Sequence, residues 1–105
     1  MKQQEKLKFE AQAQIMKALA HSTRLFIVHR LAEREHCVCE LTDLIGADIS
    51  TVSKHLSIMK NAGIIGSERR NTNIYYSLKM PCILNFFSCA NEVLKKKLEE
   101  QMDIV

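Results

Sequence analysis

Two short helical patterns joined by a glycine turn constrain the fold of this chain more than any other feature. Residues 40–45 have the composition of a short helix, Gly46 begins a turn, and Asp48 is a good N-cap for a second helix. That second helix is expected to end near Asn61, because Gly63 follows it and glycine is favoured just beyond a helix C-terminus. Two helices with a tight glycine-containing turn between them predict a helix-turn-helix motif.

The rest of the chain predicts further helices and one small β-hairpin. Apolar residues recur at helical spacing before the motif, whereas two runs after Gly63 have strand composition and flank a polar tip. Pro81 suits the first turn of a long last helix. The expected elements are helices 7–19, 23–34, 40–45, 48–61 and 82–102, strands 64–68 and 73–78, and a hairpin tip at 69–72. The predicted fold class is therefore mainly α with a small β-hairpin.

Length and composition indicate one globular domain, residues 1–105, with 47% hydrophobic and 26% charged residues. One Pro and three Gly favour helices over a many-stranded sandwich. The net charge of +3 hides a polarised distribution, since residues 33–48 hold five acidic residues and one basic residue. Residues 54–73 hold four basic residues and one acidic residue.

Several classes of protein are excluded by missing patterns. No apolar run approaches the roughly 20 residues that span a bilayer, and the first ten residues lack the apolar core of a secretory signal. We therefore expect no membrane partner and a cytoplasmic location, where the four cysteines stay reduced and act as ligands, sensors or core residues. The chain has no phosphate-cradling glycine loop, no H-E-x-x-H motif and no recognisable nucleophile, so neither an organic cofactor nor an enzyme is expected.

The second helix of the motif carries a polar, basic face opposite its apolar stripe. At about 100° per residue, its apolar residues fall within one narrow arc. The opposite arc holds Ser50, Lys54, Ser57 and Asn61. It lacks carboxylates, which repel phosphates, whereas short hydroxyls and amides permit close approach to base edges. With Arg69 and Arg70 at the hairpin tip as contacts to the flanking backbone or minor groove, these features predict binding to double-stranded DNA.

Cys37 and Cys39 lie one residue apart at the start of the helix before the turn. A helix N-terminus favours the thiolate form, and thiolates are the preferred ligands of soft metal ions. Residues i and i+2 of a regular helix point about 200° apart, so both sulfurs reach one ion only if the helix start is distorted. Ion capture is therefore expected to reshape this helix and move the next one. The alternative is that both are small buried hydrophobic residues.

The remaining cysteines and histidines carry weaker signals. Cys82 and Cys89 lie seven residues apart and share a face of the last helix with Phe86 and Val93. This face is the natural dimer seam, where packing between subunits is favoured over a second thiolate site or a redox pair. The histidines are interpreted singly: His21 as a helix-start residue, His29 as structural, His36 as a solvated loop residue or a third ligand, and His55 as near the DNA.

Four segments resemble the ArsR/SmtB metalloregulatory repressors. They are KALAHSTRLFIV from Lys17, CVCEL from Cys37, STVSKHL from Ser50 and NAGII from Asn61. The resemblance covers residues 13–97 and is sharpest at CVCEL, which is similar to the arsenic- and cadmium-sensing branches. It implies a winged helix-turn-helix homodimer, joined through its terminal helices, that binds operator DNA and dissociates when an inducer binds.

The resemblance also implies roles for particular residues. The recognition-helix positions are Ser50, Thr51, Ser53, Lys54 and His55, and the wing is residues 69–73, with Arg69 and Arg70. The metal site falls on Cys37 and Cys39, and Thr42 replaces the third cysteine that is frequent in the arsenic-sensing branch. The matching N-terminal arm has no cysteine, and only Cys82 remains of the zinc site on the last helix.

The expected function is a homodimeric repressor released by trivalent arsenic or antimony, which two or three thiolates satisfy. Cadmium or lead is the second choice, since Cys82 or Cys89 would complete a larger shell. A redox or persulfide switch on the same fold is a further alternative. A small thiol enzyme is disfavoured, because nothing in the sequence positions a general base or a substrate pocket.

Overall fold

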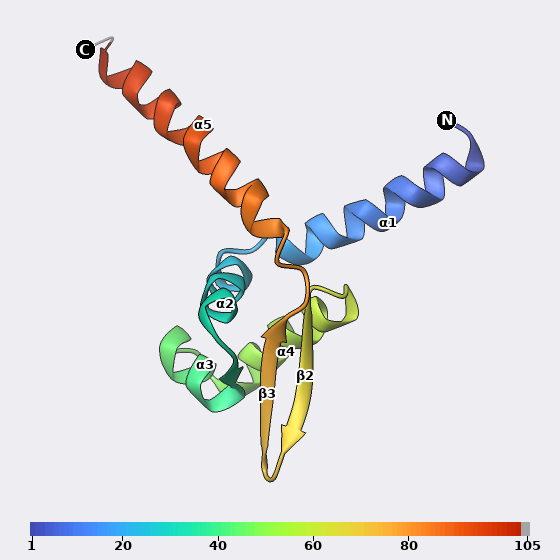
Figure 1. Ribbon diagram of the computed structural model, residues 1–105, viewed down its shortest axis with the longest axis vertical. Helices are drawn as coiled ribbons and strands as arrows, with labels where there is room; N and C mark the ends of the chain where they lie inside the picture. Colours follow the sequence, from blue (N-terminus) through green and yellow to red (C-terminus); the bar gives the residue numbers. More distant parts are fainter. Residues whose placement is uncertain (104–105) are drawn as a thin grey trace.

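The computed structural model describes residues 1–103 as five helices around a small antiparallel sheet (Figure 1). In chain order the elements are α1 (Gln3–Leu19), α2 (Ser22–Glu33), β1 (His36–Cys37), α3 (Val38–Ile45), α4 (Ile49–Asn61), β2 (Ile65–Arg70), β3 (Asn73–Leu78) and α5 (Ile83–Asp103). The predicted fold class and the order of helices and hairpin are confirmed. Three helices begin earlier than expected, at Gln3, Ser22 and Val38, and β1 was not predicted.

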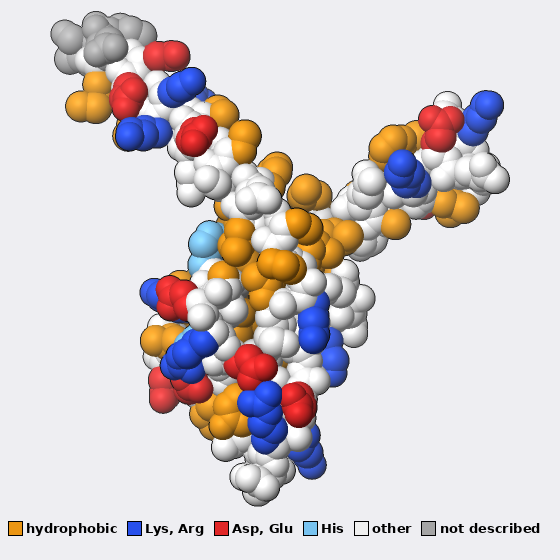
Figure 2. Space-filling model, in the orientation of Figure 1, with side chains coloured by type: hydrophobic (Ala, Val, Ile, Leu, Met, Phe, Trp, Pro, Cys, Tyr) orange, Lys and Arg blue, Asp and Glu red, His pale blue; other side chains and the backbone are white. Residues whose placement is uncertain are grey.

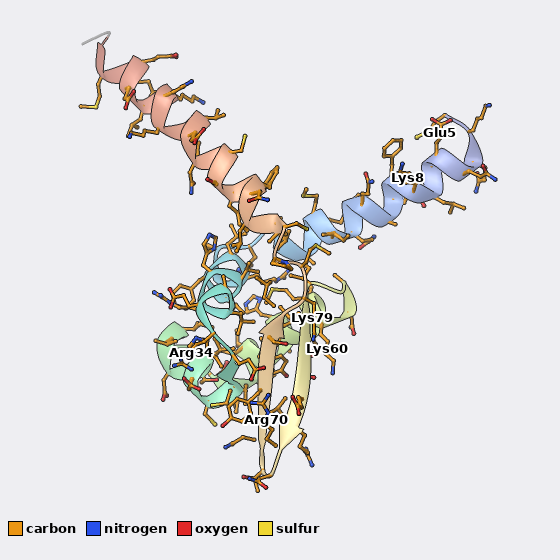
Figure 3. The ribbon with its side chains drawn as sticks, viewed as in Figure 1. Glu5, Lys8, Arg34, Lys60, Arg70 and Lys79 are labelled. Carbon is orange, nitrogen blue, oxygen red and sulfur yellow. The ribbon has the colours of Figure 1, made fainter. Side chains whose placement is uncertain are left out.

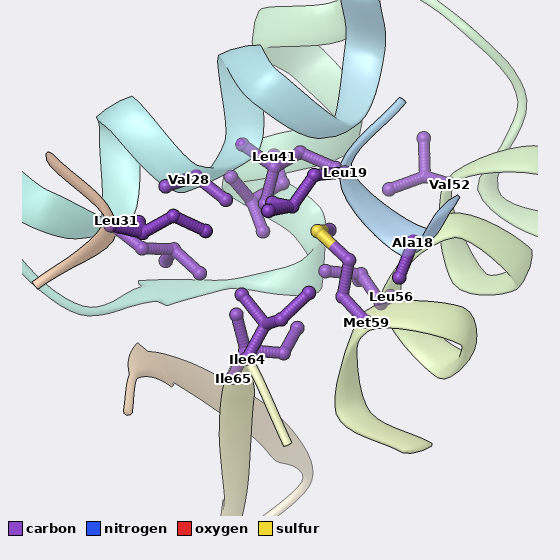
Figure 4. Close-up of a cluster of buried hydrophobic side chains, with 12 residues drawn as sticks. Ala18, Leu19, Val28, Leu31, Leu41, Val52, Leu56, Met59, Ile64 and Ile65 are labelled. Carbon is purple, nitrogen blue, oxygen red and sulfur yellow. The ribbon is translucent and has the colours of Figure 1, made fainter. Parts of the chain in front are cut away.

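Apolar side chains from α1 to α4, from β2 and from the start of α5 meet in a single core (Figure 4). The fully buried large side chains are Ile27, Val28, Leu41, Val52, Leu56, Met59 and Ile64. Three of these, Val52, Leu56 and Met59, form the predicted apolar arc of α4. Because this arc is anchored in the core, the opposite face of α4 has a fixed direction outward.

The turn between α3 and α4 has the predicted glycine and cap. Gly46 ends α3 with left-handed backbone, at φ 77°, and its N–H donates to the Thr42 carbonyl at 2.9 Å. The Asp48 carboxylate then caps α4 by accepting the Thr51 N–H at 3.1 Å. The helix-turn-helix motif is thus held by local backbone chemistry at both sides of the turn.

The sheet has the strand order β1-β3-β2, so β3 lies in the middle. The predicted hairpin tip at 69–72 is wrong, because the ladder continues to the Arg70–Asn73 pair and only Asn71 and Thr72 turn the chain. Asn71 takes φ 58°, a conformation that asparagine tolerates better than most residues.

The outer strand β1 corrects the interpretation of His36. This residue pairs with Tyr76 of β3 and is 4% exposed, so it is not a solvated loop residue. Tyr76 itself packs against the core. Because partners across a sheet project on the same face, pairing with β3 places the imidazole over the core side.

Helices α1 and α5 project away from the core (Figure 1). Residues 1–14 and 91–102 are all exposed, and apolar side chains lie along both helices (Figure 2). The radius of gyration is 16.7 Å, against about 13 Å for a compact domain of 100 residues. One chain therefore leaves two apolar helix faces without a partner. No helix within residues 1–103 is long and apolar enough to cross a membrane.

We expect Gly46→Ala to lower the free energy of unfolding by about 1–2 kcal/mol, the cost of left-handed backbone in an L-residue. No atom lies within 4 Å of the added Cβ, so the loss measures backbone strain alone. Gly46→Asn is the matched control and should lose less, because asparagine adopts this conformation more readily. Urea denaturation measures both variants, and an Ala variant as stable as the wild type would contradict the prediction.

Candidate nucleic-acid interface and thiol site

The outward face of α4 is polar and solvent-exposed. Ser50, Thr51, Ser53 and Lys54 are all exposed there, in the first two turns of the helix. The Asp48 carboxylate accepts the Thr51 N–H and the Ser50 hydroxyl, at 3.1 and 3.2 Å. Hydrogen bonds from Thr51, through its side chain and then its backbone, and from Ser50 lower the pKa of this carboxyl. This carboxylate and the Ser50 hydroxyl are therefore engaged in the cap, and the Ser53 hydroxyl and the Lys54 ammonium lie exposed beyond it.

His55 differs from these neighbours because its ring is held inward. Its Nδ1 accepts a hydrogen bond from Arg24 Nε at 3.1 Å, and its ring centroid lies 4.5 Å from that of His21. His21 Nδ1 accepts the Thr23 N–H and so caps α2. A ring nitrogen that accepts carries no proton, so the hydrogen bond from Arg24 requires the neutral form of the His55 imidazole.

Arg24 extends this contact to α1, since its guanidinium also donates to the carbonyls of Lys17 and Ala18. The cluster therefore joins α4 to the start of α2 and the end of α1. Desolvation, followed by the charges of His21 and Arg24, lowers the pKa of His55.

The two wing arginines have different surroundings, although they are neighbours in β2. Arg69 is exposed and takes part in none of the ion pairs found within residues 1–103. Arg70, labelled in Figure 3, instead pairs with Glu35 at 2.8 Å and with Glu68 at 3.0 Å. Its guanidinium lies 4.9 Å from the Tyr75 ring centroid. Of these two arginines, Arg69 is thus the one whose charge is free.

Cys37 is the N-cap of α3 and lies outside the helix. Its Sγ accepts the Glu40 N–H at 3.4 Å, and Glu40 Oε1 accepts the Cys37 N–H at 3.3 Å, which makes a capping box. Cys37 has extended backbone, at φ −79° and ψ 161°, so the expected angle of about 200° between two helical residues does not apply. Cys37 is buried and Cys39, one residue into α3, is exposed.

Glu40 is the centre of this cap. Besides the Cys37 N–H it binds Arg34 at 2.7 Å and His36 Nδ1 at 3.2 Å. The Arg34 hydrogen bond, and then that of the Cys37 N–H, hold the pKa of Glu40 at about 2. The carboxylate therefore stays ionised and ties the chain before β1 to the start of α3.

The described part of the chain places Cys37 and Cys39 at the start of α3 but gives them no complete metal shell. Successive strand residues project to opposite faces, so His36 and Cys37 of β1 point apart, and the buried His36 Nε2 has no hydrogen-bond partner. Within residues 1–103, no three His, Cys, Asp or Glu side chains lie close enough together to hold a metal ion. The thiols of Cys37 and Cys39 are the soft donors at this position.

Cys82 and Cys89 are exposed at and beyond the start of α5. A seven-residue helical separation is about 10 Å, whereas a disulfide spans Cα atoms less than about 7 Å apart. These two residues therefore cannot form a disulfide within one chain. His29 of α2 donates Nδ1–H to Leu25 and stacks on Phe87, which places it between α2 and α5.

Known proteins share this arrangement. Residues 21–67 match the family described as bacterial regulatory protein, arsR family. An uncharacterized HTH-type transcriptional regulator of Methanocaldococcus jannaschii is 42% identical over 71 residues, which cover 66% of this chain and 80% of that protein. The chain belongs to the ArsR family. Its helix-turn-helix, hairpin and terminal helices correspond to the winged helix-turn-helix fold of that family.

Two further similar proteins are a homodimeric DNA-binding domain and a cadmium resistance regulator. A homodimeric winged helix-turn-helix DNA-binding domain from Mycobacterium bovis, described as a possible ArsR-family regulator, superposes with a TM-score of 0.81 at 26% identity, covering 95% of this chain and 93% of that one. The cadmium resistance regulatory protein CadC of Listeria innocua is 40% identical over 70 residues, which cover 66% of this chain and 59% of CadC.

Sequence reasoning about this ArsR-family chain missed the residues that surround the cysteines. Glu40 was not assigned a role, although its position three residues after Cys37 is the spacing of a capping box. Glu35 and Tyr75 were missed as well, because their partner Arg70 is distant in sequence from Glu35. The C-x-x-E spacing was the signal available for the cap, and no local signal marks the Arg70 contacts.

The lowered pKa of His55 predicts acid-sensitive stability. The ordinary histidine pKa is 6.5, and the folded protein binds this proton less readily, so the contribution is full above pH 6.5 and falls as pH drops through the lower folded value. His55→Asn keeps an acceptor for Arg24 without titrating, so its stability should change less between pH 7 and pH 5. Urea denaturation at several pH values measures this, and parallel curves for both proteins would contradict it.

Proposed function

We propose that this chain is a homodimeric transcriptional repressor that binds operator DNA through α4 and β2–β3. Trivalent arsenic or antimony, captured by the Cys37 and Cys39 thiolates, releases it from the DNA. The observation that carries the proposal is the position of the Cys37 sulfur. This atom, the soft ligand of the proposed site, caps the first helix of the DNA-binding motif.

The proposed DNA contacts follow from the exposed groups. Ser50, Thr51 and Ser53 approach base edges from the N-terminal turns of α4, and Lys54 neutralises phosphate. Arg69 of the wing is free to contact the flanking backbone or minor groove. The ion pairs of Arg70 and the inward contacts of His55 favour supporting roles for these two residues.

The proposed dimer joins the apolar faces of α1 and α5 of two chains. Phe87 and Ile83 already pack on the core, whereas Phe86 is 54% exposed and Val93 and Leu94 are both 61% exposed. A second copy of the chain is the occupant that explains two long helices with exposed apolar side chains on one small domain. The homodimeric Mycobacterium bovis domain of the same fold supports this assembly.

The proposed release depends on the thiols at the start of α3. When a thiophilic ion binds, Cys37 sulfur becomes a ligand and stops accepting the Glu40 N–H, so the cap of α3 is lost. Because α3 packs against α4, a change at the start of α3 is passed to the recognition helix. An inducer releases DNA only when it binds the DNA-free form more tightly, which fits a site whose capture distorts the motif.

Trivalent arsenic or antimony is the first candidate inducer because two soft donors, Cys37 and Cys39, lie at the start of α3, and within residues 1–103 no third ligand lies beside them. Cadmium or lead is the second candidate, supported by the 40% identity with CadC. These ions favour larger thiolate shells, which need a donor from elsewhere in the dimer.

Leu94→Glu should convert the dimer into a monomer with weakened DNA binding, because it places a charge in the apolar seam and each monomer keeps half of the contacts. Ser88→Glu puts the same charge on the exposed opposite side of α5 and should stay dimeric. Multi-angle light scattering distinguishes the two. A dimeric Leu94→Glu protein would remove α5 from the interface.

Cys37→Ser and Cys39→Ser should bind DNA like the wild type and ignore arsenite. Serine at position 37 keeps a cap acceptor while it removes the soft ligand. Cys89→Ser on α5 is the control and should respond normally. The measurement is fluorescence anisotropy of a DNA site selected by the protein from a random pool, titrated with arsenite and then with Cd²⁺ under reducing conditions.

The outcomes of this titration separate the candidates. Release by Cd²⁺ alone, lost in the same two variants, would assign the site to the larger ions. Release of Cys37→Ser and Cys39→Ser by arsenite as in the wild type would contradict the site.

A further inference from the structure

Cys37 and Arg70 lie on the same face of the three-stranded sheet. Cys37 belongs to β1, which we call the cysteine strand, and Arg70 belongs to β2. Cys37 pairs with Tyr75 across one edge of β3, and Glu68 pairs with Tyr75 across the other edge. Side chains paired across a sheet project on the same face, and so do residues two apart in one strand. Cys37, Tyr75, Glu68 and Arg70 therefore form a row across the sheet.

Arg70, on the edge strand β2, reaches across this face of the sheet. Its guanidinium crosses the Tyr75 ring at 4.9 Å from the centroid and reaches Glu35 Oε2 at 2.8 Å, while a second nitrogen binds Glu68 Oε2 at 3.0 Å. The hydrogen bonds that Arg70 donates to both carboxylates raise its pKa, the bond to Glu35 most. Glu35 lies immediately before β1, two residues from Cys37. One side chain of β2 thus spans β3 and holds the chain that leads into the cysteine strand.

The same short segment is held from its other end by Glu40. This carboxylate binds Arg34, His36 and the Cys37 N–H, so residues 34–37 are fixed between the α3 cap and the wing. Backbone pairing adds a direct link, because β1 and β3 share the His36–Tyr76 and Cys37–Tyr75 pairs. A movement of the Cys37 backbone, unlike a rotation of its side chain alone, therefore acts on the wing strand β3 as well.

We infer that Arg70 is a coupling residue, which uses Glu35 and Tyr75 to tie the position of the wing to the cysteine strand, so that inducer capture is transmitted to the wing as well as to α3. The inference rests on the proposed function and names a second route of its regulation. When Cys37 is drawn out of the cap, β1 moves with it, and the Arg70–Glu35 ion pair carries this movement across β3 to β2. The wing then loses the position in which Arg69 contacts DNA.

The ion pair itself is half exposed, so it contributes little to global stability and its removal should leave the fold intact. We compare Glu35→Gln, Arg70→Gln and the double variant with Arg69→Gln, the adjacent exposed arginine. The coupling ratio is the Kd for DNA with saturating arsenite divided by the Kd without it, measured by anisotropy. Arsenite affinity of the DNA-free proteins is measured separately.

We expect Glu35→Gln and Arg70→Gln to lower the coupling ratio by about five-fold or more, with no further loss in the double variant. Arsenite affinity of the DNA-free proteins should stay within about two-fold. Arg69→Gln should weaken DNA binding and reduce its salt dependence, with the coupling ratio unchanged. If Arg70→Gln behaves like Arg69→Gln in all these measurements, Arg70 is a phosphate contact and the inference is overturned.

Amide hydrogen exchange without DNA or inducer gives an independent arm. Glu35→Gln and Arg70→Gln should speed exchange at residues 36–37 and 75–76, whereas Arg69→Gln should not. A wild-type protein that binds DNA but responds to no ion would contradict the proposed function. In that case the hydrogen-exchange measurement alone tests whether Arg70 holds the cysteine strand. Unchanged exchange in both variants would overturn the tie even if the wild type responds to arsenite.

Discussion

The Cys37 side chain and backbone belong to two structures at once. Its sulfur accepts the N–H of Glu40, the third residue of α3, and its backbone pairs with Tyr75 in the sheet. The helix-turn-helix and the wing therefore share one residue, and that residue carries a soft ligand. A serine would cap the helix at least as well, so the thiol adds chemistry that the fold itself does not need.

The elements that the sequence predicts are those with local causes. The boundaries of α4 follow from the Asp48 cap and Gly63, and its buried side follows from the spacing of Val52, Leu56 and Met59. Strand β1 has no such signature, because two residues show no periodicity and their conformation is set by pairing with β3. The burial of His36 was mispredicted for the same reason.

The site was predictable in its residue types and not in its contacts. Composition and helical phase separate the polar face of α4 from its core side, yet they do not show that His55 turns inward to Arg24. In the sequence, Arg69 and Arg70 are adjacent residues of the same type, and nothing local distinguishes them. Strand alternation places them on opposite faces, and only the folded sheet brings Glu35 to one of them.

The distribution of charge gives the Arg70 contacts a second consequence. Residues 33–48 are acidic, and they lie beside the wing that is proposed to approach DNA. In the folded chain Arg70 is shared between Glu35 and Glu68, and Arg34 pairs with Glu40, so these pairs weaken the repulsion between the carboxylates and phosphate. Breaking the Arg70 pairs would free two negative charges next to the wing. Loss of wing position and gain of repulsion then act in the same direction, so a modest structural change at Cys37 weakens DNA binding more than its size suggests.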